Sequence, residues 1–336
     1  MTIMASAPTR VDLAGGTLDL WPVQHLLDHK ATVSFGITLN AQVTVAESAN
    51  DQFHVASQDQ KLSVDGSFAA ISRSTELPLI GLIVSAVWAQ HLPPLTITTA
   101  AKSPAGAGLG GSSCLAVTVA GALLAMRRKF EDVPQRSDAD LVQLVQDIEA
   151  RLIHAPTGCQ DYWGALRGGV NILRFPFGGT EVTTLSPSKV PGLSDHLILC
   201  YSGKSRASAL NNWGVFKHVF DGDINLKNRL EEIGELSEQC ADAVMAGDLA
   251  RTLEISQAEW KCRTGLWPSI ETEETRRLDR AAREAGARFT RVCGAGGGGV
   301  MAMFADPTRH DDVKAALVAN GGVVLDGTIS ERGLQV

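Results

Sequence analysis

The chain has 336 residues, of which 44% are hydrophobic and 20% charged, a balance typical of globular proteins with a sizeable core. Its net charge of −7 argues against a nucleic-acid-binding surface, which needs faces rich in lysine and arginine. No stretch reaches the ~20 apolar residues that span a bilayer. The N-terminus also lacks the layout of a signal peptide, so we expect a cytoplasmic protein without a membrane or nucleic-acid partner.

The cysteines and histidines show no pattern of a disulfide framework or a metal site. The six cysteines are scattered without a CxxC pair, and no histidines have HxH or HExxH spacing. We therefore expect reduced, mostly buried cysteines, and we assign no metal to the histidines.

Hydrophobic periodicity predicts strands and helices in both halves of the chain. In chain order, the strands are expected at 31–45, 95–100, 168–175 and 196–201, and the helices at 79–91, 112–129, 137–153, 226–246, 249–264 and 270–285. Gly36 is expected to break the first strand. Ser137 with Asp140 three residues later predicts a capped helix start. The glutamate and arginine pairs of the last three helices predict solvated outer faces.

A turn-rich stretch at 176–195 is the best candidate for a domain boundary, because it is rich in glycine, proline and serine. It predicts an N-terminal domain at 1–185 and a C-terminal domain at 186–336. The end of the chain reads as helix, turn and strand. Strands with interposed helices in both halves predict an α+β or α/β fold.

The segment SPAGAGLGGSSC, at Ser103–Cys114, lies between a predicted strand and a predicted apolar helix. Glycines let the backbone turn and let an anion approach N–H groups without interference from a Cβ atom. The helix start adds unpaired N–H groups and the positive end of the dipole. Ser112 and Ser113 can offer hydroxyls to phosphate or Mg²⁺. The segment therefore predicts a phosphate-binding loop.

Other glycine motifs compete for this loop. Gly106, Gly108 and Gly111 fit GxGxxG, and Glu131 follows at the distance that a dinucleotide-binding fold uses, so an NAD-dependent dehydrogenase is one alternative. However, that motif normally follows the first strand of its domain. No Walker lysine and no GxSxG elbow is present. A glycine-rich connector without a ligand is the remaining alternative.

Three segments in order resemble the motifs of the GHMP kinase superfamily. APTRVDLAGGTLD at 7–19 is similar to its first motif, the loop at 103–114 to its second, P-x-x-x-G-L-G-S-S-A, and VCGAGGGG at 292–299 to its third. A fourth segment, GCQDYWGALRGGVN at 158–171, resembles the G-x-Q-D-Q-Y-A-x-x-x-G-G-x-N stretch of the heptose-7-phosphate kinase and sugar-1-kinase branch. The chain departs from these patterns at 162–164 and at Gly111, which replaces a serine.

The resemblance implies an α+β GHMP kinase fold, with an N-terminal domain like ribosomal protein S5 domain 2 and a C-terminal ferredoxin-like domain. ATP would lie in the groove between them. The implied reaction is Mg²⁺-dependent transfer of the γ-phosphate to a sugar or sugar phosphate of the heptose 7-phosphate or hexose type, at the anomeric hydroxyl. A GHMP kinase for a non-sugar alcohol and a catalytically inactive ATP-binding regulator remain alternatives. The oligomeric state is not predicted.

By the same resemblance, Asp161 is the candidate catalytic base, because a positioned carboxylate can take the proton of an attacking hydroxyl. Arg10 would hold that carboxylate ionised and offset phosphoryl charge. The structural alternatives are a capping aspartate and a surface arginine. Ser112 and Glu149 are the expected Mg²⁺ ligands, since Mg²⁺ prefers oxygen, and Asp147 is the alternative to Glu149.

Nucleotide and acceptor contacts follow from the same motifs. Nucleotide contacts are expected at Pro104, Gly106, Ala107, Gly108, Leu109, Gly110, Gly111, Ser112 and Ser113. Acceptor contacts are expected at Gly16, Thr17, Asp19, Gly296 and Gly297. Asp19 is the most informative of these, because a carboxylate that accepts two hydroxyl hydrogens is a usual way to orient a sugar.

Overall fold

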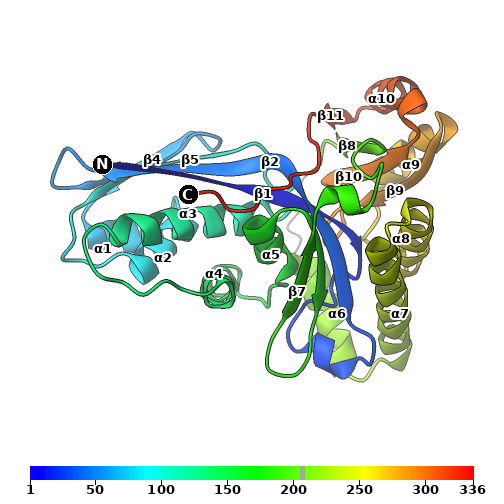
Figure 1. The fold of residues 1–336 in the computed structure, drawn as a ribbon, viewed down its shortest axis with the longest axis horizontal. Helices are drawn as coiled ribbons and strands as arrows, with labels where there is room; N and C mark the ends of the chain where they lie inside the picture. Colours follow the sequence, from blue (N-terminus) through cyan, green and yellow to red (C-terminus); the bar gives the residue numbers. More distant parts are fainter. Residues whose placement is uncertain (205–208) are drawn as a thin grey trace.

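The computed structural model describes residues 1–204 and 209–336, which two β-sheets organise (Figure 1). The larger sheet has the strand order β4–β3–β5–β2–β6–β7, with β1 paired to β2. Its strands are β1 (Thr2–Ala14), β2 (Ala31–Glu47), β3 (Phe53–Ser57), β4 (Leu62–Gly66), β5 (Leu95–Ala101), β6 (Val170–Arg174) and β7 (Glu181–Leu185). The smaller sheet has the order β11–β8–β10–β9 and consists of β8 (Leu197–Tyr201), β9 (Ala287–Val292), β10 (Val300–Ala305) and β11 (Val323–Leu325).

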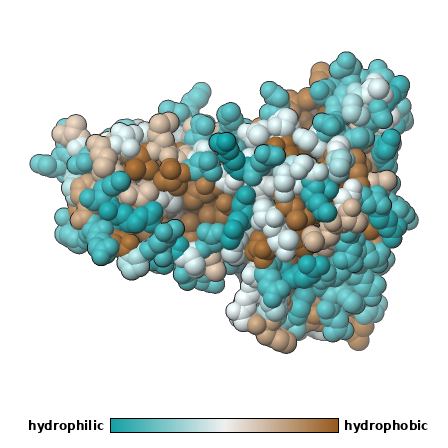
Figure 2. All heavy atoms as spheres, in the orientation of Figure 1, coloured by the Kyte–Doolittle hydropathy of each residue, from teal (hydrophilic) through white to brown (hydrophobic). Residues whose placement is uncertain are grey.

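Helices cover both sheets (Figure 1). They are α1 (Phe68–Ser72), α2 (Pro78–Val87), α3 (Gly111–Arg127), α4 (Asp138–Ile153), α5 (Gln160–Arg167), α6 (Ala209–Phe220), α7 (Ile224–Ala246), α8 (Leu249–Thr264), α9 (Glu273–Glu284) and α10 (His310–Ala319). The outer faces of α7 and α8 are polar, as predicted (Figure 2). In the described ranges no helix has the length and apolar character needed to cross a membrane, and all six cysteines are buried and unpaired, as expected.

The pairing of the strands confirms a mixed α+β architecture. In the part of the chain that the structure describes, every pairing is antiparallel except that of β3 with β5. A dinucleotide-binding fold needs a parallel sheet with its glycine loop after the first strand. The dehydrogenase alternative therefore does not fit this fold.

Strands β1 and β2 contribute to both hydrophobic cores of the molecule. Val43 and Val45 of β2 belong to a core formed with α2, α3 and α4. Val33 and Phe35 of the same strand belong to a second core formed with α7, α8 and the smaller sheet. This part of β2 is buried on both faces, so that even its polar residues Thr32 and Ser34 are fully buried. The long ribbon therefore fixes how the two halves sit against each other.

Most of the predicted elements are present, with shifted ends. Ser137 and Asp140 form the predicted capping box of α4, with N–O distances of 3.1 and 3.2 Å. Helix α2 ends at Val87 rather than at the predicted residue 91. Trp88 follows directly, and its indole Nε1 donates to the Pro93 carbonyl at 3.1 Å. The prediction of a break at Gly36 is wrong, because β2 continues through it and its missing side chain lets Gly168 approach.

Several elements were not predicted from the sequence, namely β1, β3, β4, β9, β10, α1, α5 and α6. The turn-rich stretch also contains a strand, β7, which pairs with β6 as the last strand of the larger sheet. The proposed division between 185 and 186 coincides with the end of this strand and stays a prediction.

A buried ion network joins β1 to α8 and β9. Arg291 of β9 contacts Asp12 of β1 at 2.6 Å and Glu259 of α8 at 3.3 Å, and all three side chains are fully buried. Arg263 donates to the same Glu259 at 3.1 Å. Burial alone would raise the pKa of Asp12, but Arg291, with Arg263 and Arg10, lowers it to about 2. The network therefore links the larger sheet, the smaller sheet and α8 through buried ion pairs, in which each charge is compensated by the others.

We expect Arg291→Gln to lower the free energy of unfolding by about 3–5 kcal/mol, because it leaves Asp12 buried without its main partner. Urea denaturation monitored by circular dichroism measures this. Arg251→Gln is the matched control, since Arg251 pairs with Glu254 on the exposed face of α8 and should change stability by about 0.5 kcal/mol or less. Equal losses in both variants would contradict a structural role for the network.

Candidate active site

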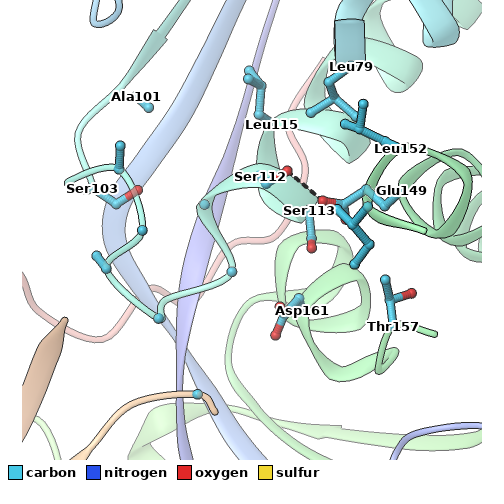
Figure 3. A pocket seen from close by; sticks show the side chains of 18 of the residues that line it. Leu79, Ala101, Ser103, Ser112, Ser113, Leu115, Glu149, Leu152, Thr157 and Asp161 are labelled. Carbon is cyan, nitrogen blue, oxygen red and sulfur yellow. Dashed lines mark hydrogen bonds between the residues drawn. The ribbon is translucent and has the colours of Figure 1, made fainter. Parts of the chain in front are cut away.

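Loops and helix ends from distant parts of the chain enclose a cleft of about 810 Å³. Its walls come from the end of β1, the loop after β5, the starts of α2, α3 and α5, the end of α4, and α8. In Figure 3 the starts of α3 and α5 and the body of α4 face one another across this space. The site is therefore built from segments that are adjacent only in the folded chain.

The predicted phosphate loop forms one wall and ends at the start of α3. Gly106, Gly108 and Gly110 have positive φ angles of 65°, 75° and 70°, which side chains other than glycine rarely adopt. A Cβ atom on Gly110 would lie 2.7 Å from the carboxyl carbon of Asp161. The glycines thus allow both the turn and the close approach of α5, and the start of α3 points unpaired N–H groups at the cleft.

The third glycine segment supports this loop from behind. A Cβ atom on Gly108 would lie 2.5 Å from the Cys293 carbonyl, and one on Gly294 would lie 2.6 Å from the Gly108 carbonyl. The Val300 amide also donates to the Ala107 carbonyl at 2.7 Å. Backbone therefore packs against backbone, which explains why glycine occurs in both segments.

Arg10 and Asp161 form an ion pair beside the loop. Arg10 Nε donates to Asp161 Oδ1 at 2.6 Å, and its Nη1 donates to the Gly108 carbonyl at 2.7 Å. Burial opposes the charge of Arg10, but the carboxylates of Asp161 and Asp12 hold its pKa above the ordinary value. Arg10 therefore stays charged and fixes the Asp161 carboxylate next to the phosphate loop.

Ser112 and Glu149 meet at the start of α3. Ser112 Oγ donates to Glu149 Oε1 at 2.5 Å (Figure 3). Glu149 is 5% exposed, and its Oε2 has no hydrogen-bond partner among the described residues. Burial raises the pKa of Glu149, although nearby hydroxyls, Ser112 first among them, oppose the shift. An under-coordinated carboxylate oxygen beside a hydroxyl is a donor set that suits Mg²⁺.

Asp147, the alternative metal ligand, lies elsewhere. It is exposed on α4, accepts from Gln143 at 2.7 Å, and does not line the cleft. Within residues 1–204 and 209–336, no group of three or more His, Cys, Asp or Glu side chains could hold a metal. A metal here would therefore depend on Glu149, Ser112 and the oxygens of a ligand.

Asp19 lies at the first-motif end of the cleft. It is 3% exposed, and its Oδ2 accepts from the Gln160 amide at 2.9 Å. Gly158 makes room for it, because a Cβ atom there would overlap the carboxylate. Burial raises the pKa of Asp19 to about 6, with the Gln160 amide opposing the shift. Asp19 is thus a buried carboxyl group that lines the cleft and whose pKa lies well above its ordinary value.

The structure brings most of the predicted site residues together. The cleft is lined by Arg10, Thr17, Asp19, Pro104, Gly106, Ala107, Gly108, Gly110, Gly111, Ser112, Ser113, Glu149 and Asp161. Leu109 is buried behind the loop, where its carbonyl accepts from the Arg10 amide at 3.1 Å. Gly16 packs against Arg263, and Gly297 donates to the Ile270 carbonyl at 2.8 Å. Neither Gly16 nor Gly296 nor Gly297 lines the cleft.

Sequence reasoning missed two parts of the cleft. One is a wall formed by the β3–β4 turn and the start of α2, with Asp59, Gln60 and Leu79. The other is Arg263, which looks like an ordinary solvated charge in a polar helix sequence but is 2% exposed. Neither carries a motif, so only the folded structure identifies them.

Comparisons with known proteins show what the chain is similar to. Residues 80–169 match the family model described as GHMP kinases N terminal domain. The chain is 24% identical to the D-glycero-alpha-D-manno-heptose 7-phosphate kinase of Campylobacter jejuni, over 99% of this chain and 98% of that protein. It is also 24% identical to a mevalonate kinase of Thermococcus sibiricus, over 100% of this chain and 98% of that protein.

A solved structure shares the whole fold. The crystal structure titled as a D-glycero-D-manno-heptose 1-phosphate kinase from Bacteroides thetaiotaomicron superimposes with a TM-score of 0.76 at 21% identity, covering all of this chain and 98% of that one. The sequence-based resemblance and the predicted fold are confirmed. Residues 80–169 are a GHMP kinase N-terminal domain, and the chain as a whole has the fold of the GHMP kinase superfamily.

Proposed function

We propose that this protein is a Mg²⁺- and ATP-dependent kinase that transfers the γ-phosphate to a hydroxyl of a sugar or sugar phosphate. The observation that carries this proposal is the Arg10–Asp161 ion pair beside the glycine loop at the start of α3. Arg10 donates to Asp161 Oδ1 at 2.6 Å and to the Gly108 carbonyl of the loop at 2.7 Å. A carboxylate next to a phosphate-binding loop suits a reaction in which a hydroxyl loses its proton as it attacks phosphorus.

Each group of the chain has a defined task in this proposal. The loop amides and the α3 start bind the nucleotide phosphates. Asp161 takes the proton of the acceptor hydroxyl, and Arg10 keeps that carboxylate oriented and offsets charge on the transferred group. Ser112 and Glu149 would hold Mg²⁺, which neutralises phosphate charge when bound. Catalysis would then come mainly from positioning and electrostatics.

The acceptor is proposed from Asp19 and from the relatives. A buried carboxylate that faces the cleft suits the paired hydroxyls of a sugar, and heptose phosphate kinases are among the similar proteins. We propose a heptose 7-phosphate or a hexose as acceptor, phosphorylated at the anomeric hydroxyl. The mevalonate kinase relative keeps a non-sugar alcohol as the second candidate. The division at 185/186 and a cytoplasmic location also remain proposals.

Asp161→Asn is expected to lower kcat by about 10²–10⁴-fold, because the amide keeps the shape but cannot accept the proton. The measurement is ADP release on a panel of sugars, sugar phosphates and mevalonate with Mg·ATP. The thermal shift induced by Mg·ATP should be retained in the variant. Unchanged turnover would remove Asp161 from the role of base. A chain stabilised by NADH but not by Mg·ATP would overturn the kinase proposal.

Glu149→Gln is expected to raise the Mg²⁺ concentration for half-maximal activity by about tenfold or more, because a carboxylate ligand is lost. Asp147→Asn is the matched control on the same helix, since its side chain is exposed and outside the cleft. Titrating Mg²⁺ at fixed ATP compares the two. An effect confined to Asp147→Asn would make Asp147, rather than Glu149, the Mg²⁺ ligand.

Activity should depend on pH through Asp19, whose pKa burial raises to about 6 from an ordinary 3.8. Only the ionised carboxylate accepts two hydroxyl hydrogens, so kcat/KM for the acceptor should fall about tenfold per pH unit below 6 and level off above it. The folded state holds this proton more tightly than the unfolded chain. The Asp19 contribution to unfolding free energy therefore decreases as pH rises from about 4 to 6.

Asp19→Asn should remove both pH effects, which pH–rate profiles at saturating Mg·ATP and thermal melts across the same range measure. A pH profile that is the same in the variant would assign the titration to another group, with Glu149 as the next candidate because burial also raises its pKa.

A further inference from the structure

One charged group in the cleft has no part in the proposed chemistry. Arg263 of α8 lines the cleft together with Thr17 and Asp19, although its side chain is only 2% exposed. Its Nη2 is buried and has no hydrogen-bond partner in the parts of the chain that the structure describes. A buried charged donor without an acceptor is costly, so its presence in a cleft points to an acceptor atom on a ligand.

The guanidinium of Arg263 is held in place before any ligand binds. Its Nε donates to Glu259 Oε1 at 3.1 Å inside the buried network. On the other side its terminal nitrogens lie against the backbone of Gly16, where a Cβ atom would come within 2.8 Å of Nη1 and closer still to Nη2. A group fixed in this way loses little side-chain entropy on binding, which favours recognition of a matching partner.

Arg263 has fewer carboxylate contacts than Arg291, the other arginine of the buried ion network. Arg291 contacts both carboxylates of the network, Asp12 at 2.6 Å and Glu259 at 3.3 Å. Arg263 shares Glu259 with Arg291 and with the Gly15 amide, which donates at 3.1 Å. The Glu259 carboxylate therefore accepts from two donors through Oε1 and contacts a third cation through Oε2, and the outer edge of Arg263 keeps positive potential toward the cleft.

We propose that Arg263 binds a phosphate group carried by the acceptor, so that the acceptor is a phosphorylated sugar rather than a neutral one. This rests on the proposed kinase function. The nucleotide phosphates have their own binding site at the glycine loop and the start of α3. Arg263 instead adjoins Gly16, next to Thr17 and near Asp19 in the first motif. Hydroxyls at Asp19 and an anion at Arg263 together describe a sugar phosphate.

The substrate test compares sugars with and without a phosphate group and adds mevalonate as a non-sugar acceptor. Wild-type protein with Mg·ATP is assayed with D-glycero-D-manno-heptose and its 7-phosphate, with mannose and mannose 6-phosphate, and with mevalonate. We expect kcat/KM to be at least tenfold higher for a phosphorylated sugar than for its unphosphorylated form. Equal or better turnover of neutral sugars would overturn the role of Arg263 and leave the kinase proposal intact. Preference for mevalonate would overturn the sugar-phosphate class, and no turnover of any acceptor would overturn the kinase proposal itself.

The variants Arg263→Gln and Arg263→Lys separate binding from folding. Loss of one buried, charge-assisted hydrogen bond should raise KM for the phosphorylated acceptor by about 10- to 100-fold in Arg263→Gln, with kcat and KM for ATP little changed. Arg263→Lys should recover part of this loss. Arg251→Gln, which changes an exposed arginine of the same helix, should change neither constant.

Inorganic phosphate provides a second readout that folding alone does not move. It should inhibit the wild type competitively against the acceptor and inhibit the arginine variants much less. If Arg263→Gln does not fold, Arg263→Lys and phosphate inhibition of the wild type decide the question. Parallel loss of kcat, ATP affinity and melting temperature with unchanged phosphate inhibition would show a purely structural role and overturn the inference.

Discussion

The buried contact between Asp12 and Arg291 is the interaction on which the rest of the site depends. Asp12 accepts from Arg291 at 2.6 Å and from the Gly294 amide at 3.0 Å. Through these two bonds, β1 is tied to the smaller sheet and to the third glycine segment. Because side chains two residues apart share a face of a strand, Arg10 lies on the same side of β1 as Asp12. Fixing β1 therefore also fixes the arginine that orients Asp161.

The second constraint is close packing of backbone at the glycine segments. Gly108 and Gly294 approach each other so closely that a Cβ atom on either would collide with a carbonyl of the other segment. The positive φ angles at both positions reinforce the requirement for glycine. The phosphate loop is thus supported by the C-terminal half of the chain, and its amides are positioned before a ligand arrives.

Burial also sets the charges of the cleft. Arg10 and Asp161 satisfy each other, whereas Glu149 and Asp19 are carboxyl groups whose pKa values burial raises. Arg263 is the complementary case, a buried cation with an unsatisfied donor. Buried polar and charged groups without a partner lower the stability of the folded chain, and a ligand that supplies the missing partner removes this cost. In our proposals, the cleft is therefore prepared for a cation at Glu149 and for an anion at Arg263.

The sequence by itself determined the local features. The apolar runs predicted β5, α3 and α8 nearly to the residue, and α4 begins after the Ser137 cap as expected. The motif order was enough to predict the GHMP kinase fold. It also singled out Arg10, Ser112, Glu149 and Asp161, which all line one cleft. These features depend on residues that are near one another in the chain, or on motifs whose spacing is visible without a structure.

Only the tertiary structure decided which distant groups meet. Asp147 and Glu149 are two residues apart on one helix, and the sequence left Asp147 open as the alternative, but the fold exposes Asp147 and buries Glu149. Arg263 belongs to a helix rich in charged residues, and it packs against the turn after β1, some 250 residues away in the chain. Strand β1 and helix α5 likewise have weak local patterns and are stabilised by their neighbours. Burial and long-range pairing are properties of the folded chain, so local sequence patterns do not report them.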